Sequence, residues 1–155
     1  MKLHQAFNVV RGEVVAFTGA GGKTSAMIGL GYELLEAGWR VLATTTTRIA
    51  EEQLPLMPHY MRYDAGTNAI SQALTQHGFV FLYDGVRDSQ VYGPDVTWLR
   101  GLLDNVDSDV LLIEADGAAG LPLKAPYDDE PTIPDEASLV VPVASLSALD
   151  LPLDE

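Results

Sequence analysis

Glycines, a lysine and hydroxyl side chains stand together in the run FTGAGGKTS, which begins at Phe17. Closely spaced glycines let backbone N–H groups curl around a phosphate group, and the N-terminus of a following helix adds partial positive charge. In such a loop Lys23 would neutralise the β- and γ-phosphates, and the Thr24 hydroxyl would ligate Mg²⁺. The usual pattern has a glycine where this sequence has Phe17, so we expect Gly19 and Gly21 to supply the flexibility. The predicted phosphate-binding residues of this loop are Thr18, Gly19, Ala20, Gly21, Gly22, Lys23, Thr24 and Ser25.

Two carboxylates end an apolar segment, DVLLIEADG, at residues 109–117. A carboxylate at the end of a buried strand can hold Mg²⁺ beside a phosphate loop, directly or through water. Glu114 and Asp116 are two positions apart, so in a strand they would point to one face and could share a cation. Gly117 would let the backbone approach a γ-phosphate. The candidate metal ligands are Thr24, Glu114 and Asp116.

A run of threonines at residues 44–47 precedes Arg48. Ligands of open α/β sheets bind at the carboxyl edge of the strands, and this run follows an apolar segment. We therefore expect hydroxyls of Thr45, Thr46 and Thr47 to meet a γ-phosphate or a Mg²⁺-bound water. Arg48 would offset charge in the transition state. Strand propensity alone is the alternative explanation for the threonines. The candidate catalytic residues are Lys23, Arg48, Glu114 and Asp116.

The chain of 155 residues is strongly acidic, with 22 Asp and Glu against 9 Lys and Arg and a formal net charge of −13. The excess is uneven, because residues 104–155 hold thirteen acidic residues and only one basic residue, Lys124. Two interpretations of Lys124 stay open: a salt bridge to Glu130 or Asp128, and binding of an anionic substrate or partner. An acidic surface repels phosphate backbones and anionic lipid, so we expect no nucleic-acid or membrane partner.

Alternating strand and helix patterns indicate how these residues are positioned. Apolar β-rich segments predict strands at 13–19, 40–46, 60–63, 79–85, 109–117 and 137–145. Helical patterns predict one helix that starts at Lys23 and stops at Gly38, one over 67–78 capped by Thr67 or Asn68, and one over 94–106 that begins at Pro94. Turn residues mark 86–94. This alternation predicts an α/β fold, a three-layer sandwich with a mainly parallel sheet.

Length and composition set the remaining limits. A chain of this size with 47% apolar residues is expected to form one domain with a real core, over residues 1–155. The absence of cysteine excludes disulfides, Cys-ligated metals and a cysteine nucleophile within this sequence. We find no signal sequence and no apolar run long enough to span a membrane, which favours a cytoplasmic protein. Residues 146–155 follow a strand without a closing helix, so we expect a truncated C-terminus or an edge strand.

Four motifs in order carry a resemblance to a known family: FTGAGGKTS, ATTTTRI (43–49), EADGAAGLPLKAP (114–126) and EPTIP (130–134). Together they resemble the YqeC-type proteins, which are linked to cofactor biosynthesis for selenium-dependent molybdenum hydroxylases. The resemblance spans residue 14 to about 145 and implies a P-loop NTPase fold with ATP or GTP and Mg²⁺ as ligands. It also implies a molybdenum hydroxylase or a cofactor-maturation protein as partner, and a chain that continues past residue 155.

Four functions remain open from these patterns. The leading hypothesis is Mg²⁺-dependent nucleotide hydrolysis or phosphoryl transfer, accessory to selenium or molybdenum cofactor maturation. A second is a nucleotide-gated maturation chaperone, in which residues 117–134 form a switch loop ordered by the γ-phosphate. The loop also resembles that of Mur-type amide ligases, which make an acyl phosphate from ATP and place a glutamate after a buried strand, as Glu114 is here. A nucleotide binder without activity is the last alternative.

Overall fold

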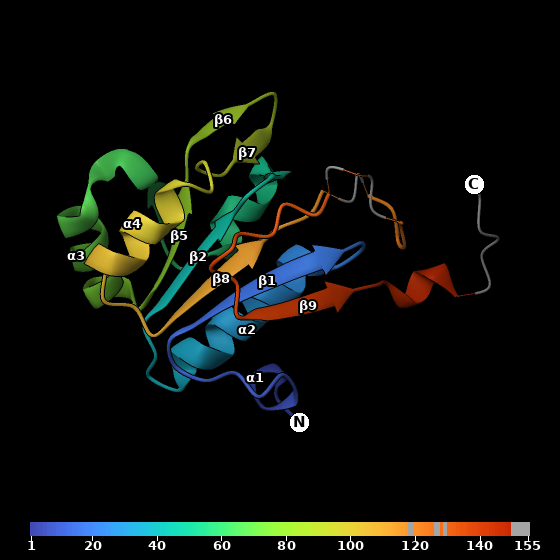
Figure 1. Cartoon of the computed structure of the whole chain (residues 1–155), viewed down its shortest axis with the longest axis horizontal. Helices are drawn as coiled ribbons and strands as arrows, with labels where there is room; N and C mark the ends of the chain where they lie inside the picture. The colour runs from blue at the N-terminus through green and yellow to red at the C-terminus, as the bar shows by residue number, and fades with distance from the viewer. Residues whose placement is uncertain (118–119, 126–127, 129, 150–155) are drawn as a thin grey trace.

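The core of the protein is a parallel sheet of six strands in the order β4-β5-β2-β8-β1-β9 (Figure 1). The computed structural model describes residues 1–117, 120–125, 128 and 130–149. The strands are β1 (Glu13–Gly19), β2 (Val41–Thr45), β4 (Tyr60–Arg62), β5 (Phe79–Tyr83), β8 (Val110–Glu114) and β9 (Leu139–Val143). The prediction of an α/β fold with a mainly parallel sheet is confirmed. Because β8 lies between β1 and β2, the carboxyl ends of these three strands meet at one edge.

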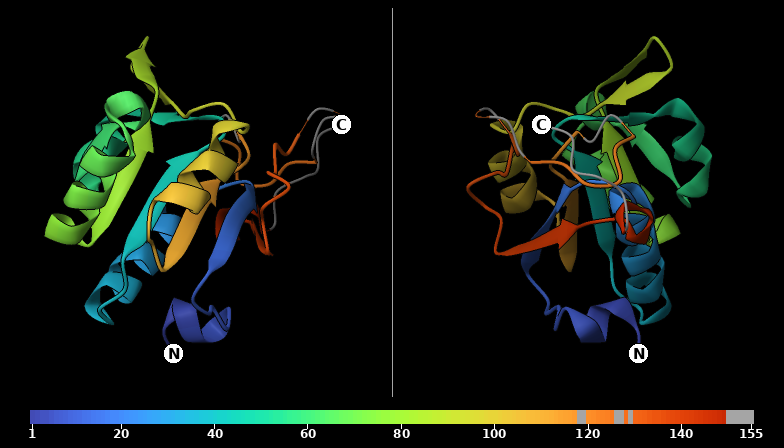
Figure 2. Two further views of the ribbon diagram at one scale, coloured as in Figure 1. Left: turned by 60° about the vertical axis from the view of Figure 1, so that its left-hand side comes forward. Right: turned by 90° about the vertical axis from the view of Figure 1, so that its right-hand side faces the viewer.

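Helices cover both faces of this sheet (Figure 2). Helix α2 (Lys23–Glu36) and the short α1 (Leu3–Ala6) lie on one face, and α3 (Thr67–His77) and α4 (Trp98–Asn105) lie on the other. Alternation along the strands divides the core, so that Val15 and Phe17 of β1 face α2 while Val14 and Ala16 pack with α3 and α4. No helix in the described part of the chain has the length and hydropathy of a membrane-spanning segment.

A second, smaller sheet stands beside the carboxyl edge of the first (Figure 1). It is antiparallel, in the order β3-β7-β6, and consists of β3 (Arg48–Ala50), β6 (Gly85–Arg87) and β7 (Gln90–Tyr92). The turn between β6 and β7 has positive φ at Asp88 and Ser89, as a two-residue hairpin requires. The sequence analysis assigned only turns to 86–94 and did not predict this sheet. Each of its strands has three residues, too few to show the alternation of apolar and polar residues by which a strand is recognised.

Other boundaries also differ from the predictions. The helix expected from Pro94 begins at Trp98, because Asp95 accepts hydrogen bonds from the Thr97 N–H and hydroxyl in a turn before it. The expected caps Thr67 and Asn68 are wrong, since α3 begins at Thr67 with Gly66 as its N-cap and no side-chain cap. Strands β2, β5, β8 and β9 are shorter than the predicted strands at 40–46, 79–85, 109–117 and 137–145. The sequence also gave no sign of α1 or of the 3-10 helices Glu51–Leu56, Tyr63–Ala65 and Leu146–Ala148.

Candidate functional site

The glycine loop between β1 and α2 forms the floor of the site. Gly19, Gly21 and Gly22 all have positive φ, between 64° and 102°, a backbone conformation that residues other than glycine rarely adopt. A Cβ at Gly19 would lie 2.4 Å from the carbonyl oxygen of Val143, so the loop also packs tightly against the end of β9. Gly22 is the N-cap of α2, and no side chain caps this helix. Its first N–H groups are therefore left to interact with an anion.

Lys23 lies folded over this loop rather than extended into solvent. Its Nζ donates a hydrogen bond to the Gly19 carbonyl oxygen at 2.8 Å, and the residue is buried. Burial lowers the pKa of Lys23, although the nearby carboxylates of Glu114 and Asp116 oppose this shift. A buried ammonium with one carbonyl contact has further donors for phosphate oxygens.

The closest contact at the sheet edge joins Thr24 to Glu114. The Thr24 hydroxyl donates to Glu114 Oε2 at 2.6 Å, and both residues are buried. The contact follows from the parallel register, which pairs Glu114 at the end of β8 with Phe17 of β1, just before the loop. Burial raises the pKa of the Glu114 carboxyl, while the Thr24 hydrogen bond and Lys23 pull it down.

A hydroxyl and a carboxylate are oxygen donors of the kind that Mg²⁺ takes, usually with waters and phosphates as its other ligands. The Thr24 and Glu114 pair fits this pattern. No group of three or more His, Asp or Glu that could hold a metal ion occurs among the described residues. A divalent ion at this pair would therefore draw most of its ligands from a nucleotide and water.

Asp116 has a different place from the one that strand alternation predicted. Strand β8 ends at Glu114, and the Asp116 carboxylate turns to the loop instead, where Oδ2 accepts the Gly19 N–H at 2.9 Å. Its Oδ1 forms an ion pair with Lys124 Nζ at 2.6 Å. The structure therefore does not bring Asp116 and Glu114 onto one cation. Asp116 is 2% exposed and holds the N–H of Gly19, while Lys23 holds the carbonyl oxygen of the same residue.

Lys124 completes this buried cluster. Its ammonium group donates hydrogen bonds to the Gly117 carbonyl oxygen and to Glu130, and it forms the ion pair with Asp116. Burial alone would lower the pKa of Lys124, but its contacts with Asp116 and Glu130 outweigh that effect and raise it. The salt bridge to Glu130 confirms one of the two interpretations of this lysine. Anion binding by Lys124 stays a prediction.

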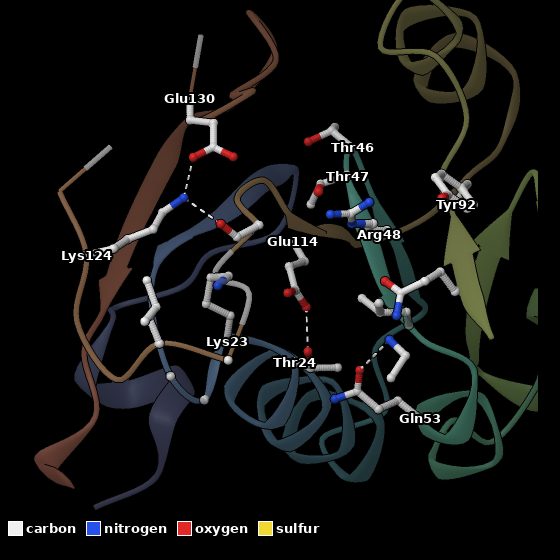
Figure 3. A pocket seen from close by; sticks show the side chains of 18 of the residues that line it. Lys23, Thr24, Thr46, Thr47, Arg48, Gln53, Tyr92, Glu114, Lys124 and Glu130 are labelled. Atoms are coloured by element: carbon white, nitrogen blue, oxygen red, sulfur yellow. Dashed lines mark hydrogen bonds and ion pairs between the residues drawn. The ribbon is translucent and has the colours of Figure 1, made fainter. Parts of the chain in front are cut away.

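A pocket of about 1180 Å³ opens above the loop (Figure 3). The glycine loop, the start of α2 and the end of β8 form one wall, and β3, the 3-10 helix Glu51–Leu56 and β7 form the opposite wall. The candidate residues that line it are Gly21, Gly22, Lys23, Thr24, Thr46, Thr47, Arg48, Glu114, Gly117 and Lys124.

Comparison with known proteins shows the family of this chain. The model of the YqeC protein family matches residues 15–155. The chain belongs to the YqeC family. The Uncharacterized protein YqeC of Escherichia coli (strain K12) is 35% identical to it over 139 residues, which cover 86% of this chain and 52% of that protein. This chain therefore spans about half the length of its curated relative. No solved structure matches it.

Not every candidate residue of this YqeC family member reaches the pocket. Thr45 is fully buried, and its hydroxyl donates to the Glu114 carbonyl oxygen at 2.9 Å, so its role in the structure is to join β2 to β8. Thr46 lines the pocket but donates to the Thr132 carbonyl oxygen at 2.8 Å. The pocket lining does not include Thr18, Gly19, Ala20, Ser25, Thr45 or Asp116.

The opposite wall of the pocket contains residues that the sequence analysis missed. Glu52, Gln53, Gln90 and Tyr92 line it together with Arg48. None of them stands in a recognisable motif. Glu52 and Gln53 follow β3 directly in the 3-10 helix, whereas Gln90 and Tyr92 reach the pocket only through the long-range pairing of β7 with β3.

Proposed function

We propose that this YqeC family member binds ATP or GTP with Mg²⁺ and hydrolyses it or transfers its γ-phosphoryl group. The observation that carries the proposal is the buried hydrogen bond from Thr24 to Glu114, at the uncapped start of α2. It sets a hydroxyl and a carboxylate beside the glycine loop, where a Mg²⁺-bound triphosphate needs oxygen ligands. The fold around it, with the loop strand next to the carboxylate strand, is consistent with a P-loop NTPase.

Different residues of the site would bind the phosphates, hold the metal ion and stabilise the transition state. Backbone N–H groups of the glycine loop bind phosphate oxygens, and Lys23 leaves the Gly19 carbonyl to contact the β- and γ-phosphates. Thr24 and Glu114 would hold Mg²⁺, which neutralises charge on the phosphates. Arg48, on the opposite wall, stabilises charge that develops on the transferred group.

The proposed biological role is accessory to selenium or molybdenum cofactor maturation of hydroxylases, and it rests on the family resemblance. The partner would be a molybdenum hydroxylase or a maturation protein. These 155 residues include no cysteine, so none of them can carry selenium as a cysteine perselenide.

A nucleotide-gated switch is the second candidate, and one set of contacts favours it. Lys124 and Glu130 pair directly beside the loop, and the Thr132 N–H donates to the Ala115 carbonyl oxygen at 2.8 Å. The chain beyond β8 is thus connected to the phosphate site at several points. A γ-phosphate that displaced Lys124 from its carboxylates would release these contacts.

Calorimetry with ATP and GTP, with and without Mg²⁺, tests nucleotide binding. Replacing Lys23 with Ala removes charge-assisted hydrogen bonds to phosphate and should weaken binding by roughly tenfold to a hundredfold. In Glu114→Gln the affinity measured with Mg²⁺ should fall to the level measured without it. Arg100→Gln is the matched control, because Arg100 is an exposed residue of α4 outside the pocket. Unchanged nucleotide binding in Lys23→Ala would disprove the assignment.

Turnover distinguishes the two candidate functions. Transfer of phosphate to a small acceptor by the chain alone would support the enzyme, and accumulation of an acyl phosphate would indicate ligase-like chemistry. Hydrolysis that stays negligible until a molybdenum hydroxylase is added would support the switch. Absence of hydrolysis in both conditions, with intact binding, would leave a nucleotide binder without activity.

A further inference from the structure

Two basic residues differ from the others in their contacts with carboxylates. Seven of the nine basic side chains contact a carboxylate: Lys2, Arg11, Arg40, Arg62, Arg87, Arg100 and Lys124. Within residues 1–117, 120–125, 128 and 130–149, Lys23 and Arg48 are the two cations without a carboxylate contact. Both line the same pocket, from opposite walls. In a chain with a net charge of −13, two cations that share a pocket and contact no described carboxylate indicate a place for anions.

The wall that carries Arg48 is a regular structure. Strands β3 and β7 pair Arg48 with Tyr92, Ile49 with Val91, and Ala50 with Gln90. Because side chains alternate along a strand, Arg48, Tyr92 and Gln90 share the face that borders the pocket. Ile49 and Val91 are buried on the other face, in the core beneath α2. Arg48 extends from β3 toward the middle of the pocket (Figure 3).

Backbone and side-chain contacts hold this wall in place. A Cβ at Gly93 would lie 1.5 Å from the Thr45 carbonyl oxygen, so the end of β7 packs against β2 at a distance that only glycine allows. Gln53 Oε1 accepts the Ala50 N–H at 3.0 Å, which joins the 3-10 helix to β3. Arg87 stacks over the Tyr92 ring at 4.7 Å. The wall is therefore preorganised before any ligand binds.

We propose that this wall is a second binding site, for a small molecule that shares the pocket with the nucleotide and is the second substrate of the proposed reaction. The planar guanidinium of Arg48 matches a carboxylate or a phosphate through two parallel hydrogen bonds. Glu52 and Gln90 line the pocket on the same wall as Arg48. The proposed ligand has an anionic group for Arg48 and hydroxyl groups that would hydrogen-bond with Glu52 and Gln90.

This inference rests on the proposed function, and its test separates the two. Glycerate and glycerol 3-phosphate are the probes, because they present a carboxylate or a phosphate on the same hydroxylated skeleton. Each is titrated by calorimetry into the chain alone and into the chain saturated with Mg²⁺ and ADP. Wild type is compared with Arg48→Gln, and Arg100→Gln again serves as control.

At least one probe should bind the wild type, and Arg48→Gln should lower the affinity for that probe by roughly tenfold or more. ADP lacks the γ-phosphoryl group on which Arg48 is proposed to act, so the same variant should change ADP affinity by less than about twofold. The proposed subsite is refuted if neither probe binds the wild type. It is also refuted if Arg48→Gln lowers the affinity for ADP and leaves the affinity for the probe unchanged. If ADP itself does not bind the wild type, the proposed function fails, and the titration of the chain alone still decides on the subsite.

Discussion

Removing the Lys124 ammonium group should destabilise the protein far more than removing an ordinary surface charge. In Lys124→Met the aliphatic chain remains, but Asp116 keeps only the Gly19 N–H as a partner. The Asp116 residue is 2% exposed and the Lys124 side chain 6% exposed, so water cannot replace the lost ion pair. Leaving a buried charge without its partner costs about 3–5 kcal/mol. We take the lower end, about 3 kcal/mol, because Glu130 in the same cluster is 29% exposed.

Urea and thermal unfolding measure this change, with a melting temperature expected to fall by about 6–12 °C for a domain of this size. The matched control is Arg62→Gln, which breaks a pair whose side chains are both 51% exposed and should cost about 0–1 kcal/mol. The double variant Asp116→Asn with Lys124→Met removes both charges and keeps an acceptor for Gly19. It should recover about 2 kcal/mol of the loss.

The pH dependence provides a further check on the same cluster. The pKa of Lys124 is raised in the folded protein, so its contribution to stability is complete below the ordinary lysine value of 10.5 and is lost as pH rises through the raised pKa. The difference between Lys124→Met and wild type should therefore be constant around neutral pH and shrink only in strong alkali. Equal losses in Lys124→Met and Arg62→Gln, or no recovery in the double variant, would refute the reasoning.

Three further predictions concern other parts of the molecule. Gly93→Ala, whose Cβ would meet the Thr45 carbonyl oxygen, should lower stability by about 3 kcal/mol in urea unfolding; an unchanged midpoint would show that the small sheet can move. The pKa of His59 is lowered by burial and by the stacked His77, so acidification below the ordinary value of 6.5 should reduce stability, less so in His77→Gln; equal pH profiles would contradict this. The pKa of Glu114 is raised, so nucleotide affinity measured with Mg²⁺ should fall as pH decreases through that pKa. Glu114→Gln should abolish this pH dependence. A wild-type protein whose affinity shows no such pH dependence would argue against metal binding at Glu114.

The sequence was most informative where local pattern and chemistry coincide. Strand β1 was predicted with its observed bounds, because an apolar β-rich run stops at Gly19 and a helical pattern starts at Lys23. The same reasoning placed Glu114 at the end of a buried strand, and the parallel register then brings it to Thr24. The bounds of these segments follow from local pattern, whereas the insertion of β8 between β1 and β2 is a long-range pairing that the βαβ rule alone does not specify.

Asp116 shows where such reasoning fails. Two-residue alternation applies only within a strand, and β8 stops at Glu114, so the orientation of Asp116 is set by its tertiary partners. Its partner Lys124 was considered only with nearby acidic residues, since sequence gives no means of choosing a partner across a loop. The second wall of the pocket was missed for a related reason, because Arg48 and Tyr92 meet only through a long-range pairing of very short strands.

Lys23 and Arg48, which have no carboxylate contact among the described residues, also affect how fast anions reach the pocket. At long range the molecule's field follows its net charge of −13, which repels an approaching anion, while attraction begins only near the pocket. Added salt shortens the Debye length from about 10 Å at 0.1 M to about 3 Å at 1 M, and it screens the distant repulsion more than the close attraction. Association of anionic ligands should therefore accelerate with ionic strength at low salt, the reverse of ordinary electrostatic steering. Mg²⁺, in contrast, would be drawn in by the same field.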